Sequence, residues 1–235
     1  MIFQFKQFTV DQFGCAMKIN TDGVLLGAMA AAEDPKTILD IGTGTGVIAL
    51  MLAQRYPNAQ IDAVEIDEAA AQTAGRNFEA SPFSARLAVH AMDFESYFDR
   101  FPERKYDLIV SNPPFYIDSL KSPGLKKTLA KHTDTPFFER FVQGVSKHLT
   151  TSGRCWLILP GNIAEMVLAL GERLNIFSQK ITRVQSYDSS QPHRVILSLG
   201  FDKVSTKITK FIIYKAIGIY SAEYTNLLQP YFLAF

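Results

Sequence analysis

The sequence has few cysteines and no long apolar run, and each absence excludes a class of protein. Its two cysteines, Cys15 and Cys155, lie far apart, so we expect neither a disulfide framework nor a cysteine-based metal or redox site. No apolar stretch approaches the ~20 residues that a membrane span needs, and the first residues lack the basic and then apolar order of a secretory signal. These features predict a cytoplasmic protein that binds no metal and no membrane.

Charge gives no strong bias either. The formal net charge of +1 provides no overall attraction to nucleic acid, so such a partner has to be argued from local patches. At 235 residues and 47% apolar content, the chain has the size and composition of one globular domain. We divide this single domain into an N-terminal extension over residues 1–35, a core over 36–205, and a C-terminal strand and helix over 206–235.

From residue 37 onward, apolar strands alternate with helical patterns, which predicts a doubly wound α/β sheet with helices on both faces. We expect seven strands, at 37–42, 61–66, 85–90, 106–111, 154–159, 177–187 and 194–201. The last two follow each other without a helical crossover, so one antiparallel strand is expected near the edge of a mostly parallel sheet. Outside this sheet we predict a helix capped by Thr21 or Asp22, a polar loop over 116–134, a helix with Pro136 in its first turn, a strand at 206–214 and a helix from Ser221.

The first of these strands ends in Asp40 and runs into a turn with Gly42, Gly44 and Gly46. Glycine allows positive φ and close approach of a ligand to the backbone. Val47 stands where the dinucleotide fingerprint requires its third glycine, which argues against a pyrophosphate cofactor. The turn resembles motif I of the S-adenosylmethionine-dependent methyltransferases with the Rossmann-like class I fold.

This resemblance implies roles for four further features. Glu65 would accept hydrogen bonds from the ribose hydroxyls, Asp93 would accept from the adenine amine, and Phe94 would lie beside the adenine ring. Asp40 would help to hold the ammonium group of the methionine part. The simpler interpretations are a solvated strand-end acid for Glu65 and a helix cap for Asp93.

The most specific chemical signal is Asn112-Pro113-Pro114-Phe115, directly after the fourth strand. Two prolines remove two backbone donors and stiffen the turn, which leaves the Asn112 side chain and the Pro113 carbonyl to accept the two hydrogens of a planar amine. Phe115 is placed to stack on a flat substrate. The motif resembles that of methyltransferases acting on adenine N6, guanine N2 or the glutamine amide; a rigid turn with a buried phenylalanine is the structural alternative.

The N-terminal residues narrow the substrate. The stretches 5–10 (FKQFTV) and 15–28 (CAMKINTDGVLLGA) closely resemble the start of the bacterial tRNA1(Val) adenine-37 N6-methyltransferases. The resemblance covers about residues 3 to 200. It implies that this segment lies over the cofactor, with Lys18, Thr21 and Asp22 among the cofactor-binding residues; a plain helix cap is the simpler interpretation of Asp22. It also implies an anticodon loop of a valine tRNA as substrate and S-adenosylhomocysteine as product.

Basic residues near the expected site form what we call the lysine rim: Lys6, Lys18, Lys121, Lys126, Lys127, Lys131 and His132. The rim would bind RNA phosphates, although lysines in a polar loop are often only solvated. His193 and Arg194 lie between the last two strands, as turn residues or as a further RNA contact.

Three other functions fit parts of the sequence. A methyltransferase for the glutamine of a release factor shares the Asn-Pro-Pro turn but usually has a helical N-terminal domain, whereas about 35 residues precede the first sheet strand here. A nicotinamide-dependent oxidoreductase is disfavoured by Val47 and by the lack of a Tyr-x-x-x-Lys pair. An inactive RNA-binding relative is disfavoured by the intact glycine turn and Asn112.

Overall fold

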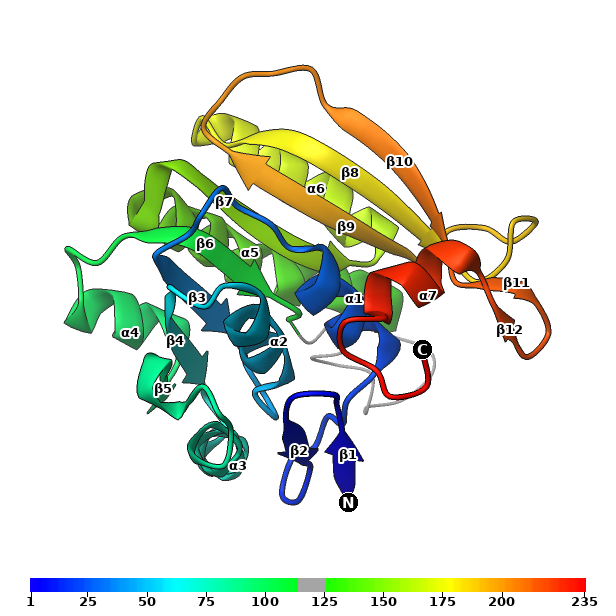
Figure 1. Cartoon of the computed structure of the whole chain (residues 1–235). Coiled ribbons are helices and arrows are strands. Elements are labelled where there is room, and N and C mark those ends of the chain that lie inside the picture. The colour runs from blue at the N-terminus through cyan, green and yellow to red at the C-terminus, as the bar shows by residue number, and fades with distance from the viewer. Residues whose placement is uncertain (114–125) are drawn as a thin grey trace.

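The computed structural model describes residues 1–113 and 126–235, with the backbone alone for 126–134. Its centre is an eight-stranded sheet flanked by helices on both faces (Figure 1). In spatial order the strands are β10 (Lys207–Ile212), β8 (Phe177–Gln185), β9 (Arg194–Gly200), β7 (Leu149–Leu159), β6 (Tyr106–Ser111), β3 (Thr37–Ile41), β4 (Gln60–Glu65) and β5 (Leu87–Ala91). The predicted α/β class is therefore confirmed.

The sheet differs from the prediction by one strand. The expected strand at 206–214 joins it as β10, parallel to β8, with Lys207 opposite Lys180. β9 is antiparallel to both β7 and β8, which confirms the single antiparallel strand near the edge. Two small antiparallel ribbons complete the strands: β1 (Ile2–Gln4) with β2 (Thr9–Asp11), and β11 (Tyr214–Ala216) with β12 (Ile219–Tyr220).

Helices divide between the two faces of the sheet according to their buried side chains (Figure 1). One face is covered by α1 (Thr21–Met29), α2 (Val47–Arg55), α3 (Glu68–Glu79) and α7 (Ala222–Leu228). The other is covered by α4 (Phe94–Arg100), α5 (Lys126–His148) and α6 (Gly161–Arg173). A short 3-10 helix spans Ser84–Arg86. The helices on each side pack their apolar faces against the sheet, which is the arrangement expected for a parallel sheet.

The helix after the Asn-Pro-Pro turn is longer than expected. α5 begins at Lys126, so Pro136 lies inside the helix rather than in its first turn, and the predicted loop is shortened from its C-terminal end. The buried apolar face of α5 includes Phe138, Phe141, Val142 and Val145.

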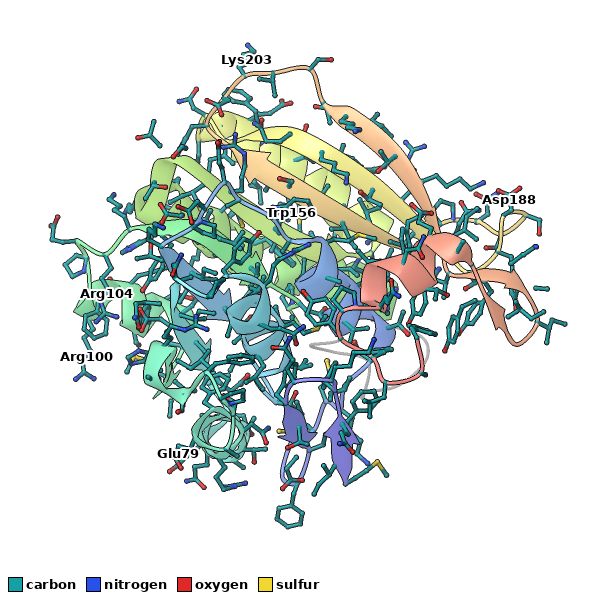
Figure 2. All side chains as sticks on the ribbon, in the orientation of Figure 1. Glu79, Arg100, Arg104, Trp156, Asp188 and Lys203 are labelled. Carbon is teal, nitrogen blue, oxygen red and sulfur yellow. The ribbon has the colours of Figure 1, made fainter. Side chains whose placement is uncertain are left out.

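α1 and the sheet are joined at the C-terminal end of the helix. Trp156 on β7 donates from Nε1 to the carbonyl of Ala31 at 2.8 Å, and its indole lies between the sheet and α1 (Figure 2). Arg55 donates to the carbonyls of Ala28 and Ala30, both at 2.7 Å, which satisfies acceptors that the helix leaves open. These bonds fix the direction in which α1 points its N-terminus.

No helix within the described residues has the length and apolar character needed to cross a membrane.

Candidate active site

The glycine turn joins β3 to α2 at the carboxyl end of the strand. Gly42, Gly44 and Gly46 have φ values of 73°, 56° and 82°, in the region that favours glycine. Among the described residues, a Cβ built on Gly42 or Gly44 would meet nothing within 4 Å, whereas one on Gly46 would lie 2.5 Å from Cε1 of Phe78. The first two glycines therefore border open space, and the third permits the turn to pack on α3.

Asp40 lies beneath this turn and has no exposed surface. Its Oδ2 accepts a 2.6 Å hydrogen bond from Thr43 Oγ1, while no described residue bonds its Oδ1. Burial raises the pKa of this carboxyl to about 7. Asp40 is thus placed to hold the turn from below, and its contact with a ligand ammonium group stays a prediction.

Glu65 ends β4 next to the turn, because β3 and β4 pair in parallel with Ile41 opposite Val64. Its Oε2 accepts from the backbone N–H of Gly44 at 2.9 Å, and its Oε1 accepts from that of Asp67 at 2.9 Å. A carboxylate offers about four lone-pair sites, so acceptor capacity remains for hydroxyl groups of a ligand.

The carboxyl end of β6 lies beside that of β3. Ile41 is opposite Ser111 in the parallel register, and Ser111 Oγ donates to the Ile41 carbonyl at 2.8 Å. Asn112 follows, half-buried, and Pro113 is buried. Pro114 and Phe115, the other two residues of the predicted motif, lie outside the described residues.

The N-terminus of α1 is the third element at this edge. A Cβ built on Gly23 would lie 4.0 Å from Nδ2 of Asn112, so the first turn of α1 borders the asparagine. Asn20 caps the helix by accepting from the N–H of Gly23 at 2.9 Å. The predicted cap at Thr21 or Asp22 was wrong, because these residues already have helical conformation, and the extended backbone that a cap requires occurs at Asn20.

Asp22 makes an ion pair that the sequence did not indicate. Arg194 at the start of β9 donates from Nε to Asp22 Oδ2 at 2.6 Å, and the two side chains are 22% and 19% exposed. The pair joins positions 172 residues apart. One carboxylate oxygen of Asp22 is therefore occupied, and its predicted contact with the cofactor stays a prediction.

A buried asparagine connects the N-terminal hairpin to the glycine turn, and sequence reasoning missed it as well. Asn77 on α3 donates from Nδ2 to the carbonyls of Asp11 at 2.9 Å and Thr45 at 2.8 Å, and its Oδ1 accepts from the N–H of Asp11 at 2.8 Å. An amide buried in an alanine-rich helix was the available signal, because such a group requires partners.

The segment between β2 and α1 rests on α3. Thr73 Oγ1 donates to the carbonyl of Phe13 at 2.7 Å, and Gln12 closes the loop by accepting from the N–H of Ile19 at 2.8 Å. Cys15 is buried there; its pKa is raised by burial and further by the charges of nearby carboxylates, Glu65 among them. Lys18 lies exposed in the same segment, so the segment flanks the space near Glu65.

Asp93 and Phe94 occupy the start of α4. Asp93 caps the helix: its Oδ1 accepts from the Ser96 N–H at 2.8 Å and its Oδ2 from Ser96 Oγ at 2.7 Å, and these bonds lower its pKa. The Phe94 ring is 7% exposed and packs edge-on against Phe137 and Phe141. The capping alternative for Asp93 is thus realised, while contacts of either residue with adenine stay predictions.

The lysine rim is largely untested. Lys121 lies outside the described residues, and so do the side chains of Lys126, Lys127, Lys131 and His132. Lys6 has another role: its Nζ donates to the backbone oxygens of Gln229 at 2.6 Å and Phe235 at 2.8 Å, which ties the two chain ends together. We therefore remove Lys6 from the rim.

The described part of the site fits an adenosyl ligand with an amino-acid tail. Open space lies over Gly42 and Gly44, and the carboxylates of Glu65 and Asp93 end neighbouring segments at the same edge of the sheet. Carboxylates accept from hydroxyls and amines and attract cations, whereas they repel a pyrophosphate. No cluster of His, Cys, Asp and Glu that could hold a metal ion occurs within residues 1–113 and 135–235.

Comparison with known proteins agrees with this geometry. Residues 19–179 match the family model described as "Methyltransferase small domain". Among solved structures, a predicted O-methyltransferase from Agrobacterium tumefaciens superposes with a TM-score of 0.69 at 18% identity, covering 89% of this chain and 96% of that one. The structure of TrmN from Thermus thermophilus gives 0.54 at 23% identity, covering 76% of this chain and 47% of that one. The fold is thus that of a Rossmann-like methyltransferase.

Proteins found by sequence comparison are more similar to this chain than these solved structures are. A Pedobacter heparinus protein named tRNA1(Val) (adenine(37)-N6)-methyltransferase is 47% identical and covers 99% of this chain and 98% of its own length. A Bacteroides thetaiotaomicron protein of the same name is 40% identical over 98% and 97%. The chain therefore belongs to the methyltransferase small domain family, in the group of tRNA1(Val) (adenine(37)-N6)-methyltransferases.

Proposed function

We propose that this protein transfers the methyl group of S-adenosylmethionine to the exocyclic N6 of an adenine in tRNA, namely adenosine 37 of tRNA1(Val) in the cytoplasm. The whole chain acts as one catalytic domain, in which residues 1–35 cover the cofactor site. The observation that carries the proposal is the contact between strand ends: Ser111 Oγ bonds the Ile41 carbonyl at 2.8 Å. Asn112 is thereby held beside the glycine turn.

The cofactor site is assigned to the residues around that turn. Gly42 and Gly44 provide the space, Glu65 the acceptors for the ribose, and Asp93 with Phe94 the adenine end. When bound, S-adenosylmethionine supplies an electrophilic methyl group on a sulfonium. Lys18, Thr21 and Asp22 belong to the segment over this site.

Asn112 and Pro113 supply the other half of the chemistry. The lone pair of an adenine amine is delocalised into the ring, so the nitrogen is a weak nucleophile. The Asn112 side-chain oxygen and the Pro113 carbonyl accept its two hydrogens, which orients the lone pair toward the methyl group. With the cofactor bound, a new N–C bond would replace the methyl–sulfur bond and leave S-adenosylhomocysteine, while one N–H proton of the amine would depart along one of these hydrogen bonds. The contribution is positioning and electrostatic stabilisation, without a covalent intermediate on the protein.

Flipping the target base out of its stack costs the least free energy in a loop, where the base is already partly unstacked. Phe115 is assigned to stack on it. The same Asn-Pro acceptor pair suits a glutamine amide or guanine N2, so the test has to identify the product rather than only detect methyl transfer.

The test uses labelled S-adenosylmethionine with total tRNA from a strain that lacks the gene, followed by mass spectrometry of the labelled RNA. We expect N6-methyladenosine at position 37 of one valine tRNA. Asn112→Ala should abolish turnover while calorimetry still detects cofactor binding. The matched control is Asn58→Ala, an exposed asparagine between α2 and β4, which should retain full activity. Label in protein glutamine or in guanine would overturn the proposal.

A further inference from the structure

Net positive charge is concentrated in one part of the fold. Residues 175–220, which contain β8, β9, β10 and the β11–β12 ribbon, hold seven Lys and Arg against two Asp and no Glu. Their formal net charge is thus +5, whereas the whole chain carries +1, so the remainder is net negative. This asymmetry gives the β10 side of the sheet an electrostatic attraction for polyanions.

Like charges face each other across the two edge strands. In the parallel register of β8 and β10, Lys180 is opposite Lys207 and Arg183 is opposite Lys210. Residues directly opposite share a face of the sheet, where like charges repel and destabilise the pair. Lys210 is compensated by Asp188, but among the described residues no carboxylate lies within ion-pair distance of Lys180 or Lys207. A bound anion would relieve this repulsion.

The face that carries Lys180 borders a groove. The groove has a volume of about 530 Å³ and lies between β8, β10 and the helices α1, α2 and α7. Thr182 and Thr209 form part of its lining, and their hydroxyls bond each other at 2.9 Å. Asn226 of α7 adds an amide. Phe211 is the aromatic residue of the lining and is 3% exposed, so the groove offers polar groups rather than a stacking surface for a base.

The charged groups of the groove favour an anion. Lys180 and Arg55 contribute two cations and Glu223 one carboxylate. The Arg55 guanidinium is held in place by its bonds to the carbonyls of α1 at 2.7 Å. Fixed cations beside hydroxyl and amide donors are the groups that bind phosphate oxygens and ribose hydroxyls.

α1 connects this groove to the active site. Its Gly23 borders Asn112, and its Met29 lines the groove. The two residues are six positions apart in the helix, which corresponds to about 9 Å along its axis at about 1.5 Å per residue. In Figure 1 the groove elements α1, α7, β8 and β10 lie on one side of the molecule, and Figure 2 places Lys203 on the connection before β10 and Arg100 on the opposite side, on α4.

We propose that the groove formed by Lys180, Thr182, Thr209, Arg55 and Asn226, together with Lys207, binds the sugar–phosphate backbone of the RNA substrate outside the loop that carries the target base. This inference rests on the proposed function, since it names a second contact for the same RNA. It also explains how a chain with a net charge of only +1 binds a polyanion.

The test compares the double variant Lys180→Ala/Lys207→Ala with wild type in filter binding of unmodified tRNA at several salt concentrations. Each lost phosphate contact makes the negative slope of log K against log salt shallower by about 0.7 to 1. We therefore expect a slope that is shallower by about 1.5, and a Kd raised about tenfold at about 0.1 M salt. Affinity for S-adenosylmethionine and kcat at saturating tRNA should not change. Because the change removes a repulsion, Tm should equal or exceed that of wild type.

Two further variants make the result specific. Lys180→Arg/Lys207→Arg keeps both charges and should retain most of the affinity. Arg100→Ala/Lys147→Ala removes equal charge from the α4–α5 side of the molecule and should leave tRNA binding within twofold of wild type. An unchanged Kd and salt slope in Lys180→Ala/Lys207→Ala, while wild type methylates tRNA, would overturn the groove assignment alone. Wild type without methyl transfer to RNA would instead overturn the proposed function.

Discussion

Gly42 and Gly218 have nearly the same positive φ but lie in different parts of the fold, so comparing their alanine variants separates the effect on cofactor binding from the effect on backbone strain. Their φ values are 73° and 72°, and a Cβ built on either meets nothing within 4 Å in the part of the chain that the structure describes. Gly42 begins the turn at the proposed cofactor site, whereas Gly218 lies in the β11–β12 ribbon. Alanine at each position therefore adopts a similarly unfavourable positive φ, but its methyl group fills a different space.

The cost to stability follows from the conformation. An L residue in the left-handed region loses roughly 1 to 2 kcal/mol. For a chain of this size, 1 kcal/mol lowers Tm by about 2 to 4 °C, so each variant should melt a few degrees below wild type. Gly46→Ala should lose more, because its Cβ would lie 2.5 Å from the Phe78 ring and something has to shift.

The cofactor distinguishes the two variants. In Gly42→Ala the new methyl group occupies space assigned to S-adenosylmethionine, and we expect the Kd to rise at least tenfold, which corresponds to about 1.4 kcal/mol. Gly218→Ala should bind the cofactor as wild type does. Calorimetric titration and thermal melting of the same samples give both quantities.

One result would refute the reasoning. If Gly42→Ala and Gly218→Ala lose equal stability and bind S-adenosylmethionine equally well, the space over the glycine turn is not the cofactor site. A much larger Tm loss in Gly42→Ala than in Gly218→Ala would show instead that the turn is strained by a contact that the built Cβ does not reveal.

Two other predictions concern charged residues near the site. Burial raises the pKa of Asp40 to about 7 from an ordinary value of 3.8, so the folded protein binds an extra proton between these values, and the unfolding free energy falls as pH rises through this window. The unfolding free energy of Asp40→Asn should therefore rise relative to that of wild type, by up to about 1.4 kcal/mol for each pH unit from pH 4 to 7, and the difference should stay constant above pH 7. Urea titrations that give the same difference at every pH would contradict this. Arg194→Ala should lower both Tm and methyl transfer, because it leaves Asp22 in the first turn of α1 without its 2.6 Å ion-pair partner. Arg154→Ala, which breaks a comparable pair with Asp202, should lower Tm alone, and equal loss of activity in both variants would contradict a specific role for Arg194.

Local sequence patterns sufficed for much of this fold. The alternation of apolar strands and helices predicted the α/β class because strand and helix periods are properties of short windows. The positions of Gly42, Gly44 and Gly46 predicted a turn with positive φ because only glycine adopts it without strain. Asn112 was placed at the end of a strand, and parallel pairing then brings strand ends to one edge.

Errors arose where a local signal had several possible outcomes. Asn20, Thr21 and Asp22 are consecutive residues that all cap helices well, so the sequence left the first helical residue open by one or two positions. Proline is common in the first turn of a helix, but Pro136 lies inside α5. The strand at 206–214 was recognised, yet its membership in the sheet depends on pairing with β8.

The sequence by itself determined the order of the elements, the glycine turn and the chemical identity of the residues at the strand ends, because backbone sterics and hydrophobic periodicity act over a few neighbouring residues. Tertiary structure alone decided that Arg194 pairs with Asp22, that Asn77 joins the N-terminal hairpin to the turn, and that Lys180 lies opposite Lys207 on adjacent strands. These contacts depend on the three-dimensional path of the chain, since their partners are up to 172 residues apart and no local pattern links them.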